Sequence, residues 1–71
     1  MRPIYKETRW VRRRIYSLTS VFTMGKTYEV KEWESEERIV ILADTGHCRT
    51  SDISFWEVDR YMENLEKHIL N

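Results

Sequence analysis

The chain has 71 residues, enough for one domain with a stability on the order of 4–10 kcal/mol. Hydrophobic residues make up 41% of it and charged residues 34%, which excludes both a disordered tail and a membrane-spanning helix. The net charge is zero, but residues 1–31 hold eight Lys/Arg against two Asp/Glu, a balance of +6, and residues 32–71 hold four against ten, a balance of −6.

The first predicted element is Arg9–Leu18, whose sequence fits either a strand or a helix. As a strand it has a basic and aromatic face, made of Trp10, Arg12, Arg14 and Tyr16. The opposite face of that strand would hold Val11, Arg13 and Ile15. As a helix it has an apolar stripe, made of Ile4, Val11, Ile15 and Leu18. We favour the strand, because β-branched and aromatic residues flank the arginines.

Two further strands are predicted at Thr27–Trp33 and Arg38–Ala43, joined by the polar connection Glu34–Glu37. The first strand alternates apolar and charged residues, as a half-buried strand does. The second contains IVILA, the most apolar run in the chain, which is apolar on both of its faces. We expect one face of each strand to form the core, made of Tyr28, Val30, Ile39, Ile41 and Ala43.

The second face of the IVILA run, Val40 and Leu42, needs a cover of its own. A helix predicted at Asp59–Leu70, with Asp59 as its N-cap, offers one. Its apolar stripe consists of Met62, Leu65 and Ile69. We expect this stripe to cover the sheet and to leave Glu63, Glu66 and Lys67 facing solvent. The alternative is that the stripe is a docking face for a partner or a second copy.

Two glycines mark positions where the backbone needs a positive φ angle or a sharp turn. Gly25 ends the loop before the first hairpin strand, and Gly46 closes the turn Asp44–Gly46 that leads into a short strand at His47–Thr50. The next segment is ambiguous. The helix begins either near Phe55, after a Ser54/Glu57 capping box, or at Asp59 after a last strand over Ser54–Val58.

The string Phe22–Val30, FTMGKTYEV, is similar to the "LT-x-GK-x-YEV" segment of small SH3-like barrel proteins of bacteriophages and their bacterial hosts. Ile39–Gly46 resembles the buried strand and "D-x-G" turn of that family, and Phe55 resembles its closing aromatic. The resemblance implies a single mainly β domain, a five-stranded SH3-like barrel over residues 9–58 followed by a C-terminal helix over residues 59–70. Small phage proteins of this size often bind and modulate a host enzyme or macromolecular machine, so the resemblance implies such a partner.

No residue pattern favours catalysis or metal binding. His47 and Cys48 are adjacent, but neighbouring side chains of a strand point to opposite faces, so they cannot act together there. One cysteine and two histidines lack the paired spacing of a zinc site, and we expect no cofactor and no enzymatic activity. The single cysteine and the absence of an apolar signal segment after Met1 indicate a cytoplasmic protein.

The arginine run supports three interpretations. In the first, its cations and rings bind single-stranded nucleic acid. In the second, its Arg, Trp and Tyr side chains form a protein-docking face. In the third, it is an edge strand whose charges prevent aggregation and pair with Glu29, Glu32 or Glu34. We favour a non-catalytic protein-binding module, a monomer or weak homodimer without membrane contact, with nucleic-acid binding as the alternative. The predicted partner-binding residues are Trp10, Arg12, Arg13, Arg14 and Tyr16.

Overall fold

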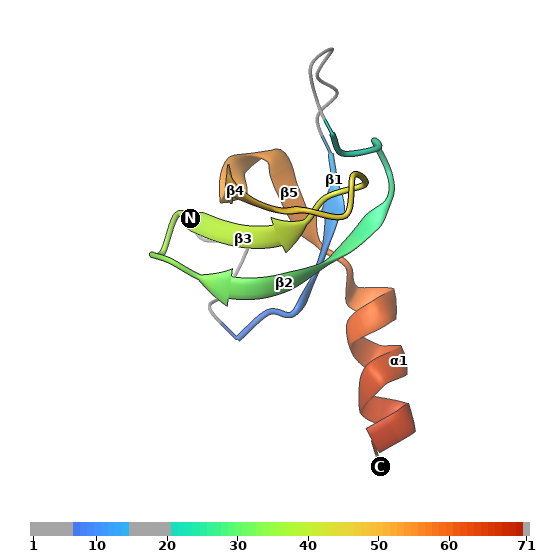
Figure 1. Ribbon diagram of the computed structural model, residues 1–71. Coiled ribbons are helices and arrows are strands. Elements are labelled where there is room, and N and C mark those ends of the chain that lie inside the picture. The colour runs from blue at the N-terminus through green and yellow to red at the C-terminus, as the bar shows by residue number, and fades with distance from the viewer. Residues whose placement is uncertain (1–6, 15–20, 71) are drawn as a thin grey trace.

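The computed structural model describes residues 7–14 and 21–70. Within them the chain forms one antiparallel sheet in the order β4-β3-β2-β1-β5, followed by a helix (Figure 1). The elements are β1 (Trp10–Arg13), β2 (Thr27–Trp33), β3 (Arg38–Leu42), β4 (Cys48–Asp52), the 3-10 turn η1 (Ile53–Phe55), β5 (Trp56–Val58) and α1 (Arg60–Leu70). The predicted mainly β class with a C-terminal helix is therefore confirmed. Closure of the sheet into an SH3-like barrel stays a prediction.

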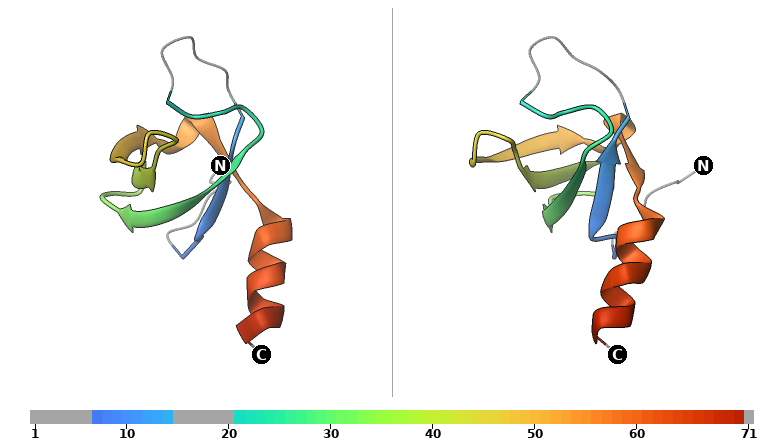
Figure 2. Two further views of the ribbon diagram at one scale, coloured as in Figure 1. Left: turned by 45° about the vertical axis from the view of Figure 1, so that its right-hand side comes forward. Right: turned by 90° about the vertical axis from the view of Figure 1, so that its right-hand side faces the viewer.

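The hairpin of β2 and β3 forms where the alternating pattern predicted it. Val30 pairs with Ile41 and Trp33 with Ile39, and a bulge interrupts the register at Lys31. Bulges increase the local twist of a sheet, and β1 and β5 run steeply across β3 and β4 (Figure 2). Gly25 and Gly46 have φ angles of 83° and 90°, so both glycine predictions are confirmed.

The core lies between the two halves of this bent sheet. Its buried side chains are Val11, Tyr28, Val30, Ile39, Ile41 and Trp56. All five predicted core residues are buried, including Ala43 just after β3, but Trp56 is a core residue that the sequence did not identify. Its indole N–H donates to the Ser51 hydroxyl at 2.8 Å, and its ring meets Phe22 and Tyr28 edge to face. Phe55, likened to a closing aromatic, is exposed instead.

Strand β1 is not an edge strand, because it lies between β2 and β5. Val11 pairs with Tyr28 on one side and with Val58 on the other. This corrects the interpretation in which the arginines protect a sheet edge from aggregation. Strand pairing ends at Arg13, and Ile15–Leu18 of the predicted strand lies outside the described residues.

The predicted cover over Val40 and Leu42 is wrong. Helix α1 packs beside β1 and projects away from the sheet, so Leu42 stays exposed (Figures 1 and 2). The position of Asp59 explains this direction. It follows β5 directly and accepts a bond from the Met62 N–H, so the helix begins at Arg60, beside β1. Glu57 belongs to β5, and the predicted capping box does not start a helix.

Among the described residues, none of the helices is long and apolar enough to cross a membrane.

Replacement of Ile41 by alanine should lower the free energy of unfolding by about 2–5 kcal/mol, because Ile41 is fully buried and its loss leaves a cavity. Leu42→Ala is the matched control on the same strand, since Leu42 is exposed, and it should change the stability by less than about 1 kcal/mol. Urea unfolding of both variants measures the two effects. Equal effects would contradict this assignment of the β3 faces.

Candidate functional site

The predicted partner-binding residues on β1 do not form one exposed basic face. Arg12 is half-buried and pairs with Asp59 at 2.9 Å and with Glu57 at 3.6 Å. Trp10 is half-buried, Arg14 is exposed, and Tyr16 lies outside the described residues. Of the predicted partner-binding residues that the structure describes, Arg14 alone is exposed, and partner binding by these residues stays a prediction.

Arg13 points into the protein, on the same face of β1 as Val11. Its side chain is 5% exposed, and its guanidinium carbon lies 5.0–5.3 Å from the ring centres of Phe22, Phe55 and Trp56. Burial lowers the pKa of this guanidinium from its ordinary value. An arginine stays charged in proteins even so, and the ring faces offer it an electrostatic partner in place of water. Arg13 is thus part of the fold and does not reach a docking surface.

Asp59 joins three elements at the start of α1. Its buried carboxylate accepts bonds from the Thr27 hydroxyl of β2 and the Met62 N–H of α1, and it pairs with Arg12 of β1. Burial alone would raise the pKa of Asp59. The bonds from Thr27 and Met62 and the ion pair with Arg12 outweigh it and hold the pKa below its ordinary value. The ionised carboxylate therefore fixes the helix to the sheet.

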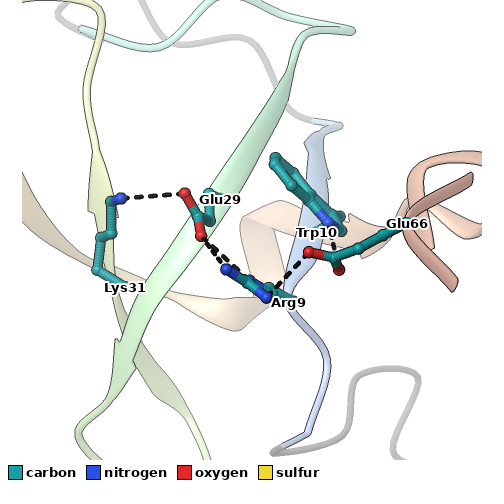
Figure 3. Close-up of polar contacts among 5 residues, drawn as sticks. All are labelled: Arg9, Trp10, Glu29, Lys31 and Glu66. Atoms are coloured by element: carbon teal, nitrogen blue, oxygen red, sulfur yellow. Dashed lines mark hydrogen bonds and ion pairs between the residues drawn. The ribbon is translucent and has the colours of Figure 1, made fainter. Parts of the chain in front are cut away.

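A second group of charges holds the helix farther along its length (Figure 3). Glu66 of α1 accepts the Trp10 indole N–H at 2.9 Å and pairs with Arg9 at 2.9 Å. Arg9 also pairs with Glu29 at 3.1 Å, and Glu29 pairs with Lys31 at 3.0 Å. The bonds from Lys31 and Arg9 lower the pKa of Glu29. Glu66 therefore faces the sheet and not solvent, which corrects the predicted orientation of the helix.

The contact between Glu66 and Trp10 leaves an apolar groove beside it. The groove has a volume of about 250 Å³ and is lined by Trp10, Met62, Leu65, Glu66 and Ile69. Tyr61, Leu65 and Ile69 follow one another at intervals of four on the helix, and they are 70%, 40% and 75% exposed. This outer row, the Tyr61/Leu65/Ile69 ridge, is an exposed apolar feature of α1. The sequence identified Leu65 and Ile69 as apolar, but it did not place Trp10 next to them.

The remaining candidates for chemistry are not assembled into a site. Cys48 is a free, exposed thiol, and His47 beside it is exposed as well. In residues 7–14 and 21–70, no three side chains of His, Cys, Asp and Glu lie close enough to hold a metal ion.

Comparison of the chain with protein-family models, with curated proteins and with solved structures finds no match. The resemblance to phage SH3-like barrels stays a prediction that rests on short motifs of the sequence. The function is therefore inferred from the geometry of the surface.

Asp59→Asn should destabilise the protein by about 1–3 kcal/mol at neutral pH, because it removes the charge that Arg12 and Thr27 stabilise. Asparagine still caps a helix well, so the variant isolates the charge from the cap. Because the folded-state pKa of Asp59 is lowered, its contribution is present above the ordinary pKa of about 4 and is lost as the pH falls through the lower folded value.

Urea unfolding of the wild type and Asp59→Asn at a series of pH values tests this expectation. The difference in unfolding free energy should be largest near neutral pH and shrink on acidification. Glu29, Asp44 and Asp52 also have lowered pKa values, but their contributions are common to both proteins. A difference that stays constant down to acid pH would contradict a charged role for Asp59.

Proposed function

We propose that the chain is a non-catalytic protein-binding module whose partner docks an apolar segment on the Tyr61/Leu65/Ile69 ridge and in the groove beside Trp10. The observation that carries this proposal is the exposure of Leu65 and Ile69 on a helix that projects from the sheet. Amphipathic helices with an uncovered apolar face commonly bind an apolar segment of another protein.

The chemistry of the groove supports an apolar partner. Glu66, the one charged residue of the lining, is already paired with Arg9 and bonded to Trp10, so a partner need not supply a charge for it. Trp10 lies at the groove with its indole N–H satisfied and its ring beside the apolar lining. Tryptophan is enriched among the residues that dominate binding energies.

Nucleic-acid binding has less support. Of the described arginines in residues 7–14, Arg9 and Arg12 are paired with carboxylates and Arg13 is buried. Phosphate binding by this segment would have to break these pairs or rely on Arg14. A phage origin and a host enzyme or macromolecular machine as the partner stay predictions of the resemblance.

A Leu65→Gln/Ile69→Gln double variant should lose its protein partner. Glutamine keeps the helix propensity and removes the apolar ridge, and loss of two central side chains should weaken binding by at least about thirtyfold, or 2 kcal/mol. The matched control is Asn64→Gln, which lies on the other side of α1, in a polar pocket with Arg60 and Lys67. All three proteins should melt alike, because the replaced side chains are exposed.

Capture of partners from a cell lysate, with and without nuclease, measures the effect. A protein retained by the wild type and by Asn64→Gln, lost by the double variant and insensitive to nuclease supports the proposal. Equal capture by the control and the double variant would exclude the ridge as the docking surface. Capture that disappears with nuclease would favour nucleic acid.

A further inference from the structure

Strand β4 lies at one end of the sheet, and no described strand pairs with the outward side of its backbone. Among the described strands it pairs with β3 alone, from Leu42 opposite Cys48 to Arg38 opposite Asp52. Two bonds extend the same ladder beyond both ends, from the Ala43 N–H to His47 and from the Ile53 N–H to Glu37, each at 2.9 Å. These bonds fix which residues of β4 face β3.

Hydrogen-bonded pairs alternate along an antiparallel ladder, so Arg49 and Ser51 direct their backbone groups to β3. Cys48, Thr50 and Asp52 therefore direct theirs away from the sheet. Within the described residues the backbone groups of Cys48 and Thr50 have no other partner, and the Asp52 carbonyl accepts only a long bond of 3.4 Å from the Ser51 hydroxyl. The outward side of β4 is thus a row of free donors and acceptors.

This edge lacks several of the devices that keep sheet edges apart, although it carries two charged residues of opposite sign, Arg49 and Asp52. Strand β4 contains no proline and no lysine, and the bulge of the sheet is in β2 and not in β4. Cys48, Arg49 and Thr50 are exposed, so no described side chain lies over the strand and blocks it. The other end of the sheet is different, because β5 is only three residues long and leads directly towards α1.

We propose that β4 is a self-association surface, on which β4 of a second copy pairs antiparallel about a two-fold axis at Thr50. The two sheets then become one continuous sheet, in the manner of strand addition. In this register Thr50 lies opposite Thr50 of the second copy, Cys48 opposite Asp52, and Arg49 opposite Ser51. The row of outward donors and acceptors is satisfied on both copies.

The sequence of β4 selects a second copy in this register. The register pairs all five residues of the strand and places no like charges opposite each other, and a threonine pair is favourable across strands. A shift by two residues in one direction places Arg49 opposite Arg49, and the shift in the other direction leaves only three residues paired. Helix α1 lies beside β1, three strands away in the sheet order, so self-association leaves the ridge free.

Amide hydrogen exchange by NMR at low and high protein concentration tests the pairing residue by residue. The amides of Cys48, Thr50 and Asp52 should exchange roughly tenfold more slowly once about nine-tenths of the chain is dimeric. Those of Arg49 and Ser51, already bonded to β3, should change little. Concentration-independent exchange of all five amides, with a monomer in sedimentation up to about 1 mM, would overturn the proposal.

Variants at Thr50 separate the pairing from the fold. Thr50→Pro removes the central outward N–H, which an edge strand tolerates, and should give a monomer with a cooperative melt. Thr50→Val is the matched control, because it keeps the N–H and the β-branched shape, and it should remain dimeric. A dimer in both variants, or loss of the dimer in Thr50→Val alone, would exclude the β4 edge as the self-association surface.

Disulfide trapping tests the register. Cys48→Ser/Thr50→Cys should form a covalent dimer on oxidation, because the two residues 50 face each other within reach of a disulfide. The wild-type protein should not, because Cys48 faces Asp52 and lies about 13 Å along the strand from its counterpart. Cross-linking through Cys48 without cross-linking through residue 50 would overturn the proposed axis.

Discussion

The arrangement of the molecule depends on the buried carboxylate of Asp59. Its side chain accepts hydrogen bonds from Thr27 of β2 and from the backbone of α1, and it forms an ion pair with Arg12 of β1. Asp59 itself comes directly after β5. An unpaired buried charge would be strongly destabilising, so these elements must meet at one point for the carboxylate to be tolerated. The start of the helix, its position beside β1 and the exposure of its outer ridge all follow from that requirement.

Part of the charge asymmetry along the chain is compensated by ion pairs between its two halves. Arg9 and Arg12 of the basic half pair with Glu66, Glu57 and Asp59 of the acidic half. Strand β1 is central, so the C-terminal segment reaches it through β5 and α1. An uneven distribution of charge in a sequence can thus reflect pairing between distant segments, and it does not by itself indicate an external anionic partner.

The parts of the fold that local patterns determine were predictable. The alternation in Thr27–Trp33 gave the bounds of β2, and the need for positive φ placed Gly46 in its turn. The parts of the fold that depend on contacts between distant residues were not predictable. The helical stripe shows which side of α1 is apolar but not what lies opposite, and Glu66 was assigned to solvent because Trp10 is far away in sequence. Trp56 was not identified as a core residue, because the sequence of residues 54–58 fits both a helix and a strand.

The pairing of Val11 with Val58 has a consequence for how the chain acquires its structure. During synthesis β2, β3 and β4 are made before Trp56–Val58, so until then β1 has only one of its two neighbours and the core lacks its largest side chain. Contacts between such distant residues must overcome a large loss of chain entropy before they contribute. The core therefore cannot be completed until the last strand has been made.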